Sequence, residues 1–176
     1  KTVRHYHEPG HLHELTFSCY RRLPLLTNES WRFELARSID RAGEETEFDL
    51  LAFVFMPEHV HLLVQSRLPT AAISDYLSKI KQPFSKWVKE RLSASSPLIE
   101  RLTVRERPGK VRFRFWQEGP GFDRNLFSSS AIRASIEYIH NNPVKEGLPE
   151  PQRTKSGRPH GTCWLRNPTP AYQRSP

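Results

Sequence analysis

The chain has 176 residues, a length that fits one compact domain or one domain with a tail. Lys and Arg number 27 against 19 Asp and Glu, which gives a formal net charge of +8. This excess favours a polyanionic partner, most often a nucleic acid, although a merely soluble basic protein has the same composition. Two cysteines exclude a disulfide framework, and no segment resembles a signal peptide or a membrane span. We expect a soluble cytoplasmic protein without a membrane partner.

The hydrophobic pattern predicts secondary structure in the order β-α-β-β-α-β-α. Strands are expected at 13–20, 48–56, 59–66 and 111–119, and helices at 28–43, 70–92 and 128–142. Asn28 or Thr27 should cap the first helix, Pro83 should kink or split the second, and a serine should start the third, which stops before Pro143. Residues 93–110 are expected to form a loose basic connection, and residues 120–126 a turn. This order predicts an α+β fold, an antiparallel sheet with helices on one face.

Two histidines interrupt the apolar segment "FVFMPEHVHLLVQS" at residues 53–66. Strand side chains alternate, so His59 and His61 should share one face, with Cα atoms about 7 Å apart. Both imidazoles could then bind one divalent ion. An ordinary half-exposed pair is the alternative, and the same spacing at 5–7 and 11–13, in a polar segment, is interpreted as mobile and non-functional. A polar group in the most hydrophobic part of the chain needs a partner, which favours a metal ion.

A tyrosine on the last predicted helix is the second candidate. Tyr138 lies off the apolar stripe of that helix, which consists of Ile132, Ile136 and Ile139. Asn142 follows one turn later on the same side. A tyrosine at a helix edge is usually a packing residue. Together with a histidine pair and a basic chain, however, it suggests phosphodiester chemistry, in which a metal polarises the phosphate and the tyrosine oxygen attacks the phosphorus.

Three motifs together resemble the single-tyrosine HUH transposases: "FMPEHVHLLV", "FWQEG…FDR" and "EYIHNNPVKEGL". The chain is most similar to the REP-associated tyrosine transposases, which are related to insertion-sequence transposases, over roughly residues 9–148. The resemblance implies a ferredoxin-like antiparallel sheet with a tyrosine-bearing C-terminal helix. It also implies that His59, His61 and Asn142 bind Mg²⁺ or Mn²⁺ and that Tyr138 is the nucleophile.

The same resemblance implies the substrate and the product. Members of this family cut single-stranded DNA beside hairpins or palindromic repeats, leaving a 5′-phosphotyrosine link and a free 3′-hydroxyl, and then rejoin the strand. A monomer is favoured over a homodimer. Basic side chains after the first strand, on the long helix and in the fourth strand are candidate phosphate contacts: Arg21, Arg22, Lys79, Lys81, Lys86, Lys89, Arg112 and Arg114. A solvated charged surface is the alternative for each.

The C-terminal residues depart from the family pattern. Residues 1–148 form the transposase-like domain, whereas residues 149–176 are rich in Pro and Arg and lack the acidic, aromatic ending with a Trp-Ser motif. Codons that could encode residues 151–164, read one base earlier, spell P-E-D-Q-E-W-S-T-A-W-Y-V-L, which resembles that ending. We hypothesise a frameshifted, disordered tail.

Three functions therefore stay open. The leading one is a metal-dependent single-stranded DNA nickase-ligase, that is, a transposase. A non-catalytic nucleic-acid-binding protein of the same fold, a decayed transposase, is the second. The third is a metal-dependent hydrolase without a covalent step.

Overall fold

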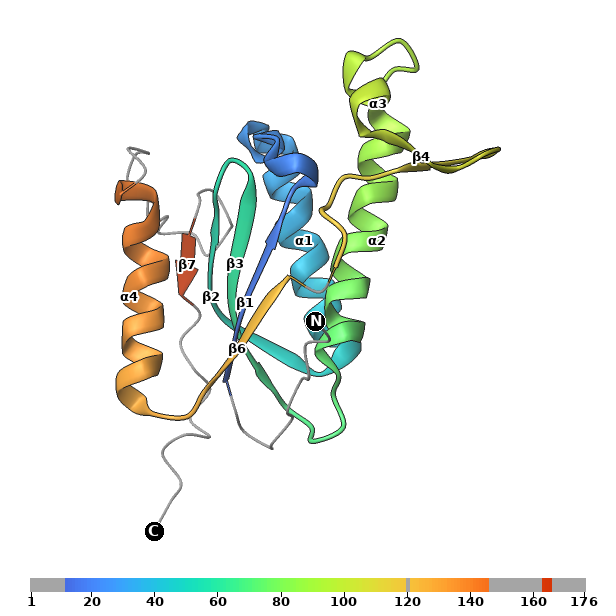
Figure 1. Cartoon of the computed structure of the whole chain (residues 1–176). Helices are drawn as coiled ribbons and strands as arrows, with labels where there is room; N and C mark the ends of the chain where they lie inside the picture. The colour runs from blue at the N-terminus through green and yellow to red at the C-terminus, as the bar shows by residue number, and fades with distance from the viewer. Residues whose placement is uncertain (1–11, 120, 146–162, 166–176) are drawn as a thin grey trace.

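The computed structural model describes residues 12–119, 121–145 and 163–165, and its centre is a five-stranded sheet (Figure 1). The strand order is β6-β1-β3-β2-β7, and every neighbouring pair is antiparallel. The strands are β1 (Leu12–Ser18), β2 (Phe48–Phe55), β3 (His59–Ser66), β6 (Phe122–Leu126) and β7 (Cys163–Leu165). The predicted antiparallel sheet is thus confirmed. Among the described helices, none is long and apolar enough to cross a membrane.

Helices cover both faces of this sheet. α1 (Glu29–Thr46) and α2 (Ile73–Arg91) lie together on one face, and α4 (Ser129–Lys145) lies on the other (Figure 1). The larger core lies under α1 and α2 and includes Val60, Leu62 and Val64 of β3. A smaller core, which contains Leu63 of β3, lies under Ile139 of α4. The prediction that helices cover one face of the sheet holds for α1 and α2. The tyrosine helix covers the second face, because the central strands are apolar on both sides.

The helix caps match the sequence, but the predicted stop before Pro143 is wrong, and Pro83 does not split its helix. The Asn28 side chain accepts a hydrogen bond from the Trp31 N–H at 3.1 Å, and the Ser128 hydroxyl accepts one from Ala131 at 3.2 Å. α2 continues through Pro83 as one helix, and α4 runs on to Lys145 through Pro143. In α2 the buried side chains on either side of the proline, Ile80, Phe84 and Val88, stabilise the helix across the missing hydrogen bond.

The region between α2 and α4 differs most from the prediction. Residues 93–110 are not a loose connection, since they contain α3 (Pro97–Leu102) and β4 (Thr103–Arg107). β4 pairs with β5 (Lys110–Phe113) in a separate two-stranded ribbon. The strand that completes the main sheet is β6, where a turn was predicted. It pairs with β1 because Gly121, at φ +80°, lets the chain approach so closely that a Cβ there would collide with the Thr16 carbonyl oxygen.

The two ends of the chain are described only in part. His13, predicted to lie in a mobile segment, is buried in β1, and its Nδ1 lies 3.0 Å from Asp123 Oδ1. Within the predicted tail, residues 163–165 form β7, which pairs with the edge of β2 and so differs from the expected disorder at that point. Residues 1–11, 146–162 and 166–176 lie outside the described residues.

Candidate active site

The two histidines of β3 converge on the face that α4 covers. In the pairing of β3 with β1, Thr16 stands opposite His61 and Ser18 stands opposite His59. The Nε2 atoms of His59 and His61 are 2.9 Å apart, and the two rings are nearly perpendicular, at 81°. The alternation of the strand therefore places the pair as its sequence predicts. The two imidazoles therefore form a single site.

The other nitrogen of each ring is held by a neighbouring side chain. His59 Nδ1 lies 2.9 Å from Glu58 Oε1, and His61 Nδ1 lies 2.8 Å from Thr16 Oγ1. A carboxylate accepts the Nδ1 proton of His59, so the Nε2 of neutral His59 carries a lone pair. The Thr16 hydroxyl can donate or accept, so it supports either tautomer of His61. Glu58 and Thr16 therefore orient the two rings, a role that the sequence alone does not reveal.

Burial tunes the protonation of this pair. His61 is only 6% exposed, and its burial, with a smaller contribution from the charge of His59, lowers its pKa to about 4. His61 is therefore neutral at pH 7, the state that a metal ligand requires. Burial opposes the ionisation of Glu58, but hydrogen bonds from His59 and Arg22 lower the pKa of this carboxyl overall. An ionised Glu58 is the form that holds His59.

Tyr138, on α4, lies against the histidine pair of β3. Its ring centroid is 5.4 Å from that of His61, and the two ring planes stand at 88°. The next residue, Ile139, is fully buried in the core under α4, whereas Tyr138 is 42% exposed. A helix edge thus holds the tyrosine beside the histidines while leaving it open to solvent. Solvent access is what a nucleophile that attacks a large substrate needs.

Asn142 lies one turn beyond Tyr138 on α4. Its side chain is buried, and its Nδ2 has no hydrogen-bond partner among the described residues. Because the amide oxygen and nitrogen of Asn are interchangeable by a flip, this position can present either a donor or an acceptor. A buried amide group without a partner is costly, so Asn142 is a natural place for a ligand.

A divalent ion fits the geometry of the two rings. Two nitrogens bound at about 2.1 Å and at a right angle to one octahedral ion lie about 3.0 Å apart, which matches the 2.9 Å separation of the two Nε2 atoms. The same separation also suits a hydrogen bond from His61 to His59. The described residues contain no group of three or more His, Cys, Asp or Glu side chains placed to hold a metal. A third protein ligand would therefore be of another kind, such as Asn142.

A buried carboxylate attaches the tyrosine helix to the sheet. Glu14 of β1 is almost fully buried, and its Oε2 accepts a hydrogen bond from Arg124 at 2.6 Å and one from Ser135 at 3.0 Å. Ser135 lies one turn before Tyr138, so this contact fixes the position of α4 beside the histidines. The sequence does indicate such a contact. A glutamate at an inward position of a strand must be paired, because an unpaired buried charge is costly.

The chain matches a family model described as "Transposase IS200 like" over residues 9–142. It belongs to the IS200-like transposase family. Its fold is similar to that of a REP-associated tyrosine transposase solved with a REP hairpin, at 21% identity, with 86% of this chain and 77% of that chain covered and a TM-score of 0.64. A putative transposase of Deinococcus radiodurans R1 matches at 19% identity, with 84% and 98% covered and a TM-score of 0.48. No curated protein matches the chain. The family resemblance seen in the motifs is confirmed.

Of the predicted phosphate contacts of this IS200-like transposase, Arg22 is linked to the histidines through Glu58. Arg21 and Arg22 form the short 3₁₀ turn η1 (Tyr20–Arg22) that follows β1. Arg22 Nη2 lies 3.2 Å from Glu58 Oε1, so Arg22, Glu58 and His59 form one chain of polar contacts. The Arg21 guanidinium lies over the Tyr20 ring, 5.2 Å from its centroid.

The other predicted contacts lie elsewhere. Lys79, Lys81, Lys86 and Lys89 are on α2, which covers the face opposite α4. Lys79 pairs with Glu45 at 2.8 Å, and the Lys81 ammonium lies 4.8 Å from the Phe17 ring centroid, where burial lowers its pKa to about 8. Arg112 and Arg114 belong to the ribbon region and both bind Glu106. The structure therefore brings together His59, His61, Tyr138 and Arg22, places Arg21 next to Arg22 in η1, and leaves the α2 lysines on the other side of the sheet.

Proposed function

We propose that this transposase cuts and rejoins single-stranded DNA beside a hairpin, with Tyr138 as the nucleophile. The observation that carries the proposal is the edge-on contact between Tyr138 and His61 at the converging histidine pair. Family membership supports an enzyme that acts on DNA. Cys19, which lies at the same end of the sheet, is a poor nucleophile because it is fully buried, and burial raises the pKa of its thiol to about 12.

The reaction needs a bond exchange at one phosphorus atom. The Tyr138 Oη attacks the scissile phosphate and loses its proton to water, so that the Oη–P bond forms as the P–O3′ bond breaks. The departing 3′-oxygen takes up a proton, and the 5′-phosphate stays on the tyrosine. Because the phosphotyrosine ester keeps the energy of the broken bond, a 3′-hydroxyl can attack it and restore a phosphodiester. Strand transfer is this reversal with a different 3′-hydroxyl.

Three residues would hold the Mg²⁺ or Mn²⁺ ion: His59, His61 and Asn142. When bound, the ion polarises the scissile phosphate and stabilises the charge that develops on its oxygens. The chain itself supplies the orientation. Glu58 and Thr16 fix the two imidazoles, burial keeps His61 neutral, and the Glu14–Ser135 contact holds the tyrosine helix in place.

A hairpin substrate is supported by the structural relative that is bound to a REP hairpin. In this chain Arg21 and Arg22 lie at the end of β1, and Arg22 contacts Glu58, the partner of His59. Guanidinium groups bind phosphate oxygens with two parallel hydrogen bonds, which holds a strand in register without reading its sequence. We assign these two residues to the backbone of the strand that is cut, and we assign the α2 lysines to more distant phosphates.

The test uses single-stranded DNA that carries the palindromes flanking the gene, labelled at either end and incubated with Mn²⁺. On a denaturing gel, the 3′-labelled fragment should move with the protein, and the 5′-labelled fragment should be released free. The Tyr138→Phe variant should give neither product. Cleavage that survives in Tyr138→Phe would support the hydrolase instead, and hairpin binding without any cleavage would support the non-catalytic protein.

A further inference from the structure

The β4–β5 ribbon stands apart from the main sheet. β4 and β5 form their own two-stranded sheet and project from the body of the molecule near the end that carries the β2–β3 turn (Figure 1). The connection is a two-residue turn of Pro108 and Gly109 between the paired residues Arg107 and Lys110. Gly109 has φ +77°, the left-handed conformation that such a turn requires and that glycine adopts without strain. The ribbon is therefore a short arm with a defined tip.

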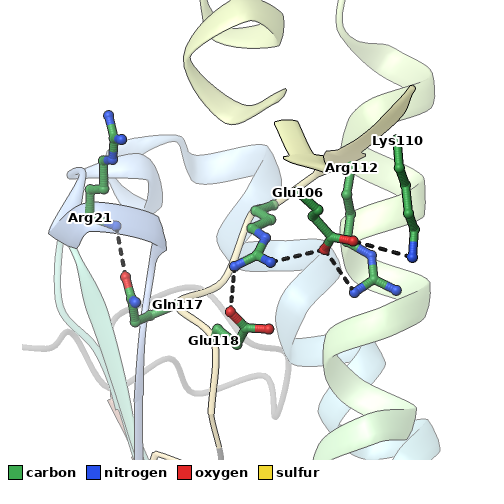
Figure 2. Close-up of polar contacts among 7 residues, drawn as sticks. Arg21, Glu106, Lys110, Arg112, Gln117 and Glu118 are labelled. Atoms are coloured by element: carbon green, nitrogen blue, oxygen red, sulfur yellow. Dashed lines mark hydrogen bonds and ion pairs between the residues drawn. The ribbon is translucent and has the colours of Figure 1, made fainter. Parts of the chain in front are cut away.

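A single carboxylate binds three basic side chains on one face of the ribbon. Glu106 binds Lys110 at 3.3 Å, Arg112 at 3.2 Å and Arg114 at 2.9 Å (Figure 2). The hydrogen bonds from Arg114 and then Lys110 lower the pKa of Glu106 to about 2, so this anion persists at any physiological pH. Arg114 also binds Glu118 at 2.7 Å, and its side chain is only 17% exposed. Arg114, predicted from sequence as a DNA contact, is thus placed as the base of the arm.

The opposite face of the ribbon is basic and open. Arg105 pairs across the strands with Val111, and both are exposed, Val111 to 66%. Neither Arg105 nor Arg107 has an ion pair or hydrogen bond with any described side chain. Between residues 103 and 114 the chain has five Lys or Arg and one Glu, a net charge of +4. This face therefore presents the two arginines beside an exposed valine.

We propose that the β4–β5 ribbon is a duplex-binding arm that enters the major groove of the hairpin stem. This inference rests on the proposed function, because it names how the same substrate is held. The major groove of B-DNA, about 12 Å wide, admits a two-stranded ribbon. Arginine binds guanine edges and phosphates there, and a small apolar side chain can contact the thymine methyl. Arg105, Arg107 and Val111 supply these groups on one face.

The base of the arm is joined to the histidine site by backbone hydrogen bonds. Gln117 N–H donates to the Ser18 carbonyl at 2.9 Å, and the Gln117 side chain accepts from the Arg21 N–H at 3.2 Å (Figure 2). Cys19 N–H in turn donates to the Glu58 carbonyl at 2.8 Å, next to His59. The arm, the η1 arginines and the histidines thus belong to one framework. A stem held by the arm would therefore stand at a fixed position relative to η1 and the histidines.

The test compares two double variants in the Tyr138→Phe background, so that only binding is measured. Arg105→Gln/Arg107→Gln removes two charges from the arm. Arg32→Gln/Arg37→Gln removes two from α1 and serves as the matched control. The probes are a DNA hairpin with about one helical turn of stem, about 10 base pairs, and an unpaired strand of the same length and composition.

The arm variant should weaken hairpin binding at least tenfold and leave binding of the unpaired strand within twofold. The slope of log K against log[salt] should fall by about 0.9 for each phosphate contact that is lost. The control should change neither affinity by more than twofold. The assignment of the ribbon as a duplex-binding arm would be contradicted by an equal loss of affinity with both variants, by an equal loss on both probes, or by no loss.

A second measurement tests the groove. Methylation of stem guanines at N7, an atom of the major groove, should interfere with binding of the protein with an intact arm and not with binding of the arm variant. Interference that is absent, or that is the same in both proteins, would overturn major-groove entry. These measurements need no cleavage, so a failure of the proposed chemistry would leave their outcome readable. Conversely, Arg105→Gln/Arg107→Gln made in the protein that keeps Tyr138 should still form a covalent adduct with unpaired DNA, which would show that the fold and the chemistry survive the loss of the arm.

Discussion

The ring of Tyr138 stands edge-on to the imidazole of His61, with 5.4 Å between their centroids. The two residues come from elements far apart in the chain, β3 and α4, and meet because α4 packs on the face of the sheet that carries the histidines. The proposed nucleophile and the proposed metal ligands therefore depend on one packing contact. Changes that loosen α4 should affect catalysis even where they touch neither group.

Ser135→Ala tests that dependence. Removing this hydroxyl deletes one of the two hydrogen bonds to buried Glu14 and should lower the free energy of unfolding by about 1–2 kcal/mol. The rate of adduct formation should fall further than hairpin binding does, because the position of Tyr138 is disturbed. Urea denaturation and single-turnover cleavage measure the two effects. Ser130→Ala, at an exposed position in the first turn of the same helix, is the control, and an equal effect from it would contradict the account.

Thr16→Val tests the orientation of His61. The change keeps the shape of the side chain but removes the oxygen that lies 2.8 Å from His61 Nδ1. Loss of such a partner typically lowers metal affinity 10- to 100-fold. Titration of the DNA-free protein with Mn²⁺, followed by electron paramagnetic resonance, measures this affinity directly. Thr16→Ser should retain it, and unchanged Mn²⁺ affinity in Thr16→Val would show that the hydroxyl does not orient a ligand.

The stability of the metal-free protein should fall as pH drops from 6.5 toward 4. Burial lowers the folded-state pKa of His61 to about 4 from its ordinary 6.5, so in this window the unfolded chain binds a proton that the folded chain does not. The difference amounts to about 3 kcal/mol at most. Urea denaturation in EDTA at several pH values measures it. His61→Gln should flatten this part of the profile, and an identical profile in the variant would contradict the assignment.

The two arginines of η1 carry backbone strain. Arg21 and Arg22 both have φ near +52°, a left-handed conformation that costs an L-residue about 1–2 kcal/mol. Arg21→Gly and Arg21→Ala should weaken DNA binding several-fold and equally, since both lose the guanidinium. Only the glycine relieves the strain, so the Gly variant should be more stable than the Ala variant by about 1 kcal/mol. Equal stabilities would mean that the turn is not strained. Fluorescence anisotropy and thermal unfolding give the two quantities.

The sequence predicts local features of this site better than its assembly. His59 and His61 could be placed on one face because strand alternation is a property of the backbone and needs no tertiary information. Tyr138 could be placed off the apolar stripe of its helix for the same reason. Neither pattern says which face of the sheet the helix covers. The helix can cover the second face because β2 and β3 carry apolar residues on both sides.

Other features were missed because their cause lies in a distant segment. β6 has the polar sequence "FDRNL" and forms a strand because it pairs with β1, which Gly121 allows by its close approach to Thr16. β5 overlaps the strand predicted at 111–119, but its partner β4 was missed because its alternating residues are charged rather than apolar. Glu14 gave a readable signal, a charge at an inward position, but its partners Arg124 and Ser135 lie more than a hundred residues away.

The measurement that tests the central claim most directly is the mass of the covalent product. After incubation with hairpin DNA and Mn²⁺, the adduct is treated with nuclease and trypsin and analysed by tandem mass spectrometry. Cleavage after Arg133 and Lys145 yields the peptide 134–145, in which Tyr138 is the only tyrosine. The account predicts this peptide with a nucleotide 5′-phosphate on the Tyr138 oxygen. A nucleotide on any other residue, or cleaved DNA with every peptide unmodified, would contradict it.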